Sequence, residues 1–211
     1  MKKKHADNFF KHGELRIGTL YDFRNEEKHG SEIGDKDEGT KTLTTDGYHF
    51  IDTADSSTIP SWYAKGFNDS FKLVDAARLQ IHARDGVRVR LTIPDRYVFC
   101  MSDDYDSGLI ENGGYSACIR IHNPGDFFAA LSKEMRRKAN WLGWGKCRYR
   151  PRLILGDHDD ELEPALIKEE RYSYQKEVRA IWAARQDNQD NIEPFILKVK
   201  KARYYCELIC A

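Results

Sequence analysis

The sequence has no excess of charge of either sign and no long hydrophobic run. Its 211 residues contain 34 basic and 34 acidic side chains, so net charge by itself favours neither a nucleic-acid nor a membrane partner. No stretch approaches the roughly 18 consecutive apolar residues that a membrane-spanning helix needs. The basic run at residues 2–4 is followed by polar residues instead of the apolar segment of a signal peptide. We therefore expect a cytoplasmic protein with no membrane partner.

Closely spaced cysteine pairs are also missing. The chain has five cysteines, an odd number, and none belongs to a C-x-x-C pair. This pattern favours reduced thiols over a disulfide framework or a structural zinc site. Internal repeats and low-complexity linkers are absent too, and the 40% of apolar residues suffices for one sizeable core. We predict a single domain over residues 1–211 without a metal site.

Strand patterns outnumber helix patterns along the chain. The clearest helix begins with Asn123 as N-cap and Pro124 in the first turn, and its apolar periodicity continues to Arg137. A second helix is expected over residues 69–81 and a short one over 5–12. Alternation and β-branched or aromatic residues predict strands at 14–20, 87–93, 97–101, 116–121, 148–155, 177–183 and 195–199. Because no βαβ rhythm is present, we predict an α+β fold with mainly antiparallel sheets.

The first candidate functional residue is Arg16. Arg16 and Gly18 fall on one face of their predicted strand, whereas Leu15 and Ile17 fall on the other. An arginine beside a glycine can offer its guanidinium fork to a phosphate that approaches the backbone closely. The alternative is an ordinary surface arginine on a half-buried strand.

The second candidate is Ser102, where an apolar strand ends and an acidic loop begins. A serine at a strand end can hydrogen-bond to a ligand that crosses the sheet, or to a carboxylate that does chemistry. The alternative is that Ser102 only caps the junction between strand and loop. No G-x-S-x-G motif surrounds it, which disfavours a serine hydrolase.

The third candidate is the pair Gln175 and Glu177, which leads directly into an apolar strand. In an extended strand, residues two apart point to the same face, so the two polar side chains are expected to share one site. The alternative for Glu177 is an ion pair with Arg179 or with another basic group on that face.

The order of these motifs resembles the ADP-ribosyltransferase superfamily, in its arginine-serine-glutamate branch. The resemblance implies split β-sheets with flanking helices and NAD as co-substrate. It also implies that Arg16 contacts the NAD phosphates, that Ser102 supports the nicotinamide side, and that Glu177, with Gln175, is catalytic. Breaking the nicotinamide–ribose bond passes through an oxocarbenium-like state, which a nearby carboxylate can stabilise.

Aromatic side chains are further candidates for the NAD site. Tyr21, Tyr105 and Tyr174 lie near the three motifs in the sequence, and a tyrosine ring can stack on nicotinamide or on a bound base. The sequence does not distinguish among them.

The segment that begins at Arg16 and includes the GDKDEG run at residues 34–39 resembles uncharacterised bacterial proteins linked to phage defence and toxin systems. This resemblance implies a toxin or antiviral-defence effector that an antitoxin protein neutralises. Aromatic residues at Trp62, Tyr63 and 204–206 are the candidates for such an interface.

Residues 133–152 form a strongly basic stretch with interleaved aromatic residues and a single acid, Glu134. Cations that follow phosphates beside aromatic platforms are typical of single-stranded nucleic-acid grooves. The alternatives are a solvated basic face or a protein-binding surface, since an acidic run follows at 157–163. The candidate nucleic-acid-binding residues are Arg136, Arg137, Lys138, Trp141, Trp144, Lys146, Arg148 and Arg150.

The sequence thus predicts an NAD-dependent mono-ADP-ribosyltransferase, a glycosyltransferase that modifies nucleic acid, with RNA favoured over DNA as the acceptor. One alternative is a non-enzymatic nucleic-acid-binding module in which Arg16 and Glu177 are structural. A weaker alternative is a metal-dependent nuclease, because closely spaced carboxylates suit hard cations. The carboxylates concerned are Asp35, Asp37, Glu38, Asp103 and Asp104.

Overall fold

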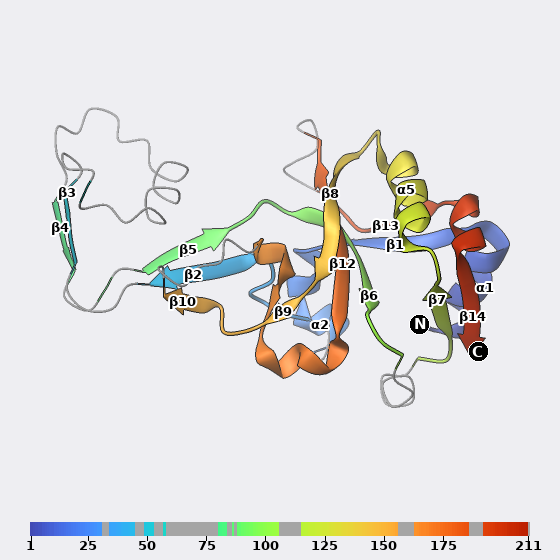
Figure 1. Cartoon of the computed structure of the whole chain (residues 1–211), viewed down its shortest axis with the longest axis horizontal. Helices are drawn as coiled ribbons and strands as arrows, with labels where there is room; N and C mark the ends of the chain where they lie inside the picture. The colour runs from blue at the N-terminus through green and yellow to red at the C-terminus, as the bar shows by residue number, and fades with distance from the viewer. Residues whose placement is uncertain are drawn as a thin grey trace.

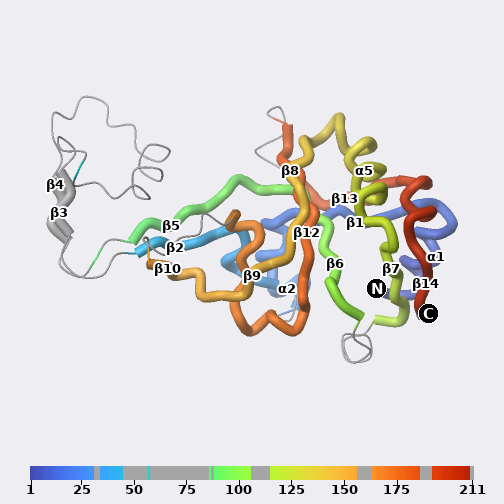
Figure 2. Tube along the Cα trace, viewed as in Figure 1, coloured from blue at the N-terminus to red at the C-terminus, as the bar shows by residue number. Residues whose placement is uncertain are grey.

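The computed structural model describes residues 1–30, 34–44, 49–52, 57, 80–83, 86, 88–105, 115–155, 163–185 and 192–210. Within them the fold is α+β with mostly antiparallel strand pairs, as predicted. The described strands include a five-stranded sheet and a smaller three-stranded sheet. Figure 1 shows helices beside the larger sheet and the smaller sheet to one side of it. The Cα trace in Figure 2 follows the same path.

The five-stranded sheet carries the candidate residues. All neighbouring strands in it are antiparallel, and four of the five were predicted to within two residues. The exception, β8, contains two glycines and an asparagine, which are poor strand formers. The strand order is β13 (Phe195–Lys198), β1 (Glu14–Thr19), β6 (Arg96–Ser102), β12 (Glu177–Ala184) and β8 (Ala139–Lys146).

Helices cover one face of this sheet. Leu15, Ile17 and Trp182 point to that face and pack in the main core with α1 (Lys3–His12) and α5 (Pro124–Met135). The predicted helix 5–12 therefore exists. So does the predicted helix at Asn123, whose side chain accepts a hydrogen bond from the backbone of Asp126. The helix η7 (Lys200–Tyr205) contacts both α1 and α5.

The opposite face has a smaller apolar core. Leu20, Val98 and Ile181 pack there against η4 (Pro164–Leu166). Beyond this small core, towards the end of β6 and the start of β12, the same face becomes polar and carries Glu177 and Arg179. This change from apolar to polar along one sheet face marks the candidate site.

The sheet opens between β1 and β6. The two strands pair only at Gly18 with Val98 and at Thr19 with Tyr97. The earlier part of β1 pairs with β13, and the later part of β6 pairs with β12. In Figure 1, β1 runs towards α1, while β6 turns away from it alongside β12.

The second sheet consists of β10 (Leu153–Leu155), β2 (Thr40–Thr44) and β5 (Arg88–Thr92). The predicted strand 148–155 is wrong as a single element. Pro151, which cannot donate a backbone hydrogen bond, interrupts it, and its halves β9 (Arg148–Tyr149) and β10 join different sheets.

Three two-stranded sheets complete the described strands. They pair β9 with β11 (Ile167–Lys168), β7 (Cys118–Ile121) with β14 (Cys206–Cys210), and β3 (His49–Asp52) with β4 (Gln80–Ala83). The predicted helix over 69–81 lies mostly outside the described residues, and its last two positions are wrong because they belong to β4.

Three short helical elements border the polar face of the large sheet. They are η1 (Asp22–Arg24), α2 (Glu26–His29) and η5 (Glu170–Gln175). No helix in the described ranges has the length and apolar character that crossing a bilayer requires.

Candidate functional site

A cleft of about 1270 Å³ lies where β1 and β6 diverge. Four residues predicted from the sequence, Arg16, Ser102, Gln175 and Glu177, line it. Strand register explains three of them. Ser102 pairs directly with Glu177, and Arg16 lies two residues from Gly18, which pairs with Val98 on the same strand as Ser102. Arg16, Ser102 and Glu177 therefore share one face of the sheet.

Arg16 lies at the mouth of the cleft, with 43% of its side chain exposed. Its guanidinium donates to Asp22 Oδ2 at 2.5 Å, and the same carboxylate accepts Lys28 Nζ at 2.5 Å and contacts His29 Nε2 at 2.9 Å. Burial by itself raises the pKa of Asp22, but hydrogen bonds from Lys28 and Arg16 bring it below its usual value. The result is a group of three basic side chains around one carboxylate.

Lys28 and His29 were missed by the sequence analysis. They belong to α2, a four-residue helix that is too short to show an apolar periodicity. His29 also lines the cleft, and its ring lies 5.3 Å from that of Phe23.

Ser102 is exposed at the end of β6. Its Oγ donates to the backbone oxygen of Gln175 at 3.1 Å and accepts from the backbone N–H of Asp104 at 3.4 Å. The junction-capping role considered for this serine is therefore present. The same contacts fix the end of η5 beside the start of β12.

Gln175 is not in a strand, so the reason given for placing it beside Glu177 was wrong. It ends η5, and Lys176 follows in the left-handed region with φ of 43°. A different group joins the two side chains. Lys168 Nζ, from β11, donates to Gln175 Oε1 at 2.5 Å and to Glu177 Oε2 at 2.6 Å.

Glu177 is buried, lines the cleft, and forms the ion pair with Arg179 that was considered as the alternative to a catalytic role. Arg179 Nε donates to Glu177 Oε1 at 2.7 Å, and its Nη1 and Nη2 donate to the two oxygens of Glu38 at 2.7 and 2.8 Å. Burial opposes ionisation, but the charges and hydrogen bonds of Arg179 and Lys168 lower the pKa of Glu177 to about 2. Glu177 is therefore an anion at neutral pH.

The buried ion network extends beyond Glu38. Arg152 Nη2 donates to Asp35 Oδ2 at 2.5 Å and lies 3.9 Å from Glu38 Oε1. Asp35, Glu38 and Arg179 are at most 1% exposed, and Arg152 is 9% exposed. Charges this deeply buried persist only when they are paired and hydrogen-bonded.

Two of the three candidate tyrosines lie at the cleft. Tyr105 and Tyr174 line it, with 48% and 45% of their surface exposed. Tyr21 is not among the lining residues. Its hydroxyl donates to the backbone oxygen of Ile93 at 2.9 Å, and Arg24 lies 3.6 Å above its ring. The prediction that Tyr21 belongs to the cofactor site is therefore not supported by its position.

The predicted nucleic-acid-binding residues do not form one continuous patch. Arg136, Arg137 and Lys138 precede β8, whereas Lys146, Arg148 and Arg150 lie at its end or beyond. At about 3.3 Å per residue, the eight-residue strand separates the two groups by roughly 25 Å.

The tryptophans of the basic stretch do share a face. A bulge at Gly143, with φ of 138°, brings Trp141 and Trp144 to the same side of β8, where both rings contact Phe128. Glycine suits this left-handed backbone. Trp144 is 53% exposed and lines the cleft.

The carboxylates considered for a nuclease are each engaged by a cation. Among the residues that the structure describes, no group of three or more His, Cys, Asp or Glu side chains could hold a metal ion. The pairs are Asp35 with Arg152, Asp37 with Arg90, Glu38 with Arg179, Asp103 with Lys146 and Asp104 with Lys176.

The aromatic residues proposed for an antitoxin interface have different positions. Trp62 and Tyr63 lie outside the described residues. Tyr204 is 67% exposed, while Tyr205 and Cys206 belong to the main core or pack against it. Tyr204 is thus the member of the C-terminal group that is open to a partner.

Comparison with protein-family models, with curated proteins and with solved structures gives no match to this chain. The geometry of the cleft is therefore the basis for assigning a function.

Proposed function

We propose that the cleft binds NAD and that the protein transfers ADP-ribose from it to an acceptor. The observation that supports this most directly is the convergence of Arg16, Ser102 and Glu177 on one sheet face around one cleft. These residues come from three consecutive strands of the sheet order. They are also the residues that the ADP-ribosyltransferase resemblance assigns to NAD binding and catalysis.

The size and charge of the cleft suit a dinucleotide. Its volume of about 1270 Å³ exceeds the roughly 300–1,000 Å³ of typical small-molecule pockets. The basic group of Arg16, Lys28 and His29 at its mouth can receive a diphosphate, with Asp22 holding these side chains in place until the ligand binds. Tyr105 and Tyr174 supply exposed rings for stacking.

The chemistry follows from the ionised Glu177. The bond between ribose C1′ and the nicotinamide nitrogen breaks, and its electron pair leaves with neutral nicotinamide. A lone pair of the acceptor then bonds to C1′, and the acceptor's proton passes to solvent. Positive charge grows on the ribose during bond cleavage, so a fixed carboxylate stabilises the transition state electrostatically. With a pKa of about 2, Glu177 is suited to this role and not to that of a general acid.

Lys168 and Arg179 act here as positioning residues. They hold both oxygens of Glu177 at 2.6 and 2.7 Å, so the carboxylate cannot rotate away from the cleft. Their charges also offset part of its negative charge.

A second candidate function is a nucleic-acid-binding module without catalysis. The contacts of Glu177 with Lys168 and Arg179 favour it, because they satisfy the carboxylate in the absence of any ligand. In that case the cleft residues stabilise the fold, and the protein's activity is to bind nucleic acid. The sequence favours RNA over DNA as that nucleic acid.

The test measures NAD binding and nicotinamide release with three proteins: wild type, Arg16→Gln and Lys198→Gln. Arg16 is exposed, so its loss leaves the core intact, and charge-assisted hydrogen bonds of about 1.5–3 kcal/mol predict a roughly 10- to 100-fold weaker NAD affinity. Lys198 is the matched control. It is an exposed cation with an ion pair, on the neighbouring strand β13, and does not line the cleft.

A second assay compares the Glu177→Gln variant with the wild type. Each protein is incubated with labelled NAD and, in separate reactions, with RNA, single-stranded DNA or a protein extract as the acceptor. We expect a roughly 100- to 1,000-fold slower release of nicotinamide, which is the range for loss of one electrostatic transition-state contact. Circular dichroism and urea unfolding check that the variant folds. A folded wild-type protein that neither binds NAD nor releases nicotinamide with any acceptor contradicts the proposal and favours the binding module.

A further inference from the structure

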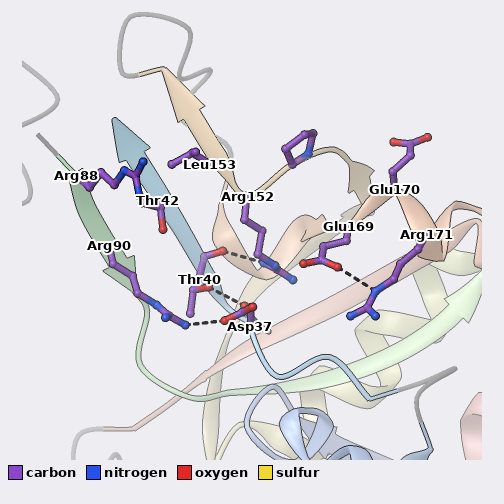
Figure 3. Close-up of a pocket in the computed structure, with 11 residues that line it drawn as sticks. Asp37, Thr40, Thr42, Arg88, Arg90, Arg152, Leu153, Glu169, Glu170 and Arg171 are labelled. Carbon is purple, nitrogen blue, oxygen red and sulfur yellow. Dashed lines mark hydrogen bonds and ion pairs between the residues drawn. The ribbon is translucent and has the colours of Figure 1, made fainter. Parts of the chain in front are cut away.

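A second pocket, which we call the outer pocket, lies on the three-stranded sheet. It has a volume of about 650 Å³, and its lining includes four arginines and two threonines. Figure 3 shows these side chains converging from separate segments. The arginines are Arg88 and Arg90 from β5, Arg152 before β10 and Arg171 from η5, and the threonines are Thr40 and Thr42 from β2.

Strand geometry explains why the arginines of β5 meet the threonines of β2. Arg88 and Arg90 are two residues apart in β5, so both point to one side of the sheet. Arg90 pairs with Thr42 across the strands, which places the threonine hydroxyl on that side as well. Guanidinium groups and hydroxyls are both hydrogen-bond donors to an anion.

The arginines keep donors that their present contacts do not use. Arg90 donates to Asp37 at 2.7 Å, and Arg171 Nε forms an ion pair with Glu169 Oε2 at 2.9 Å, yet the two arginine side chains remain 59% and 53% exposed. Arg88 makes no ion pair with any residue in the described ranges. A guanidinium has five N–H donors, so each of these side chains can take a second acceptor.

Arg152, which lines the same pocket, has one buried donor for which the described residues offer no acceptor. Its two terminal nitrogens donate to Thr40 O at 2.7 Å and to Asp35 Oδ2 at 2.5 Å. Its Nε is buried and has no hydrogen-bond partner within the described part of the chain. A buried, unsatisfied N–H costs about 1–3 kcal/mol, so the described protein contacts do not fully satisfy Arg152.

The outer pocket also contains acids, and these limit which ligand fits. Asp37, Glu169 and Glu170 line it with the four arginines, so a small anion gains little from net charge. A ligand with several phosphates in a row, each contacting one guanidinium fork, gains from repeated bidentate contacts instead.

The outer pocket and the cleft share a wall. The turn at residues 35–38 supplies Asp37 to the outer pocket and Glu38 to the cleft. The helix η5 likewise supplies Arg171 to one and Gln175 to the other. At about 2.0 Å per residue, these two positions are roughly 8 Å apart along the helix.

We propose that the outer pocket binds the phosphate backbone of single-stranded nucleic acid and that this strand is the acceptor in the cleft. The transfer step rests on the proposed function, whereas binding does not. Arg148 and Arg150 lie on the segment that joins the two sites, and Tyr105 and Tyr174 offer exposed rings at the cleft for bases. A base or a hydroxyl of the bound strand supplies the lone pair that bonds to C1′ and loses its proton to solvent.

The test uses a fluorescent single-stranded RNA of 12 nucleotides and its DNA equivalent, with anisotropy over a series of salt concentrations. The double variant Arg88→Gln, Arg171→Gln is expected to bind at least tenfold more weakly. Its log–log salt slope should fall by about 1.4, because each lost phosphate contact contributes about 0.7 for a single strand. The matched control is Lys198→Gln, Lys201→Gln, two exposed cations on β13 and η7 that line neither pocket, and it should bind within twofold of wild type.

The outcomes separate this proposal from the proposed function. Acceptor-independent nicotinamide release should be unchanged in the double variant, because neither arginine lines the cleft. If nicotinamide release fails in the wild type but RNA binding still depends on Arg88 and Arg171, the outer pocket stands and the transferase does not. Oligonucleotide binding that is absent, or equal in the double variant and the control, overturns the proposal. The proposal is also overturned if a phosphorylated peptide, at the same phosphate concentration, displaces the labelled RNA as well as an unlabelled oligonucleotide does.

Discussion

The cleft and the outer pocket use the same residue types in opposite ways. In the cleft, Glu38, Glu177 and Arg179 are almost completely buried and satisfy one another through short, multiple contacts. In the outer pocket, Arg90 and Arg171 each make one ion pair at the surface and stay more than half exposed. A buried network fixes geometry, because breaking it leaves a desolvated charge. Surface pairs are weak and exchange readily with a ligand.

Asp37 and Glu38, which are consecutive residues in one turn, show the same difference between the outer pocket and the cleft. Glu38 has no exposed side-chain surface and binds both terminal nitrogens of Arg179. Asp37, next to it, is 29% exposed and binds one nitrogen of Arg90. Because the two residues belong to the same turn, their carboxylates differ mainly in how deeply they are buried and in which arginine they pair with. This contrast is why we propose that Glu38 helps to fix the geometry of the cleft, whereas Asp37 gives up its arginine partner to a ligand in the outer pocket.

The largest expected effect is that of Glu38→Gln on stability. The substitution removes the charge that pairs with Arg179 and leaves a buried guanidinium partly uncompensated, which costs about 3–5 kcal/mol. Asp37→Asn is the matched control and should cost about 1 kcal/mol or less, because its pair is at the surface. Urea unfolding at neutral pH measures both. Equal losses in the two variants would mean that burial does not separate the two sites.

An intermediate effect is expected on acid unfolding through Glu177. Its pKa falls from 4.5 to about 2 on folding, which at about 1.4 kcal/mol for each tenfold change in proton affinity corresponds to roughly 3 kcal/mol. The unfolded chain binds the proton first as pH falls. This stability is therefore fully present above about pH 4.5 and is lost as pH falls towards 2.

The measurement is the unfolding free energy of wild type and Glu177→Gln between pH 7 and pH 2. The wild type should lose more stability than the variant across the window from 4.5 to 2, since the variant has no carboxyl group to protonate there. Asp103→Asn is a suitable control, because this exposed carboxylate pairs with Lys146 at the surface. Parallel curves for wild type and Glu177→Gln would show that the carboxylate is not held ionised by Arg179 and Lys168.

Sequence predicted the strands of the cleft well and its supporting residues poorly. Arg16, Ser102 and Glu177 lie on strands whose alternation is visible locally, so their shared face follows once the strands are paired. The role of Glu38 depends on Arg179, 141 residues away, and no local pattern contains that contact. Lys168 lies in a two-residue strand, which is too short to show a period.

Two errors have a common physical origin. The prediction for Gln175 assumed an extended chain up to Glu177, but Lys176 adopts a left-handed conformation that reverses the path. The prediction of one strand over 148–155 ignored the interruption at Pro151, which sends β9 and β10 into different sheets. In both cases a single backbone position overrode the side-chain pattern, and Pro151 itself lines the outer pocket.

The smallest expected effect concerns the surface pair of Arg90 and Asp37. A double-mutant cycle with Arg90→Gln and Asp37→Asn should give a coupling energy of about 0.2–1 kcal/mol at low salt. At about 1 M salt, where the screening length is roughly 3 Å, the coupling should approach zero. The pair then costs little to open, and a phosphate can displace Asp37 from Arg90. A coupling of several kcal/mol that persists in high salt would instead make the pair a fixed part of the fold, like Glu38 with Arg179, and would leave the outer pocket with fewer donors for a nucleic-acid backbone.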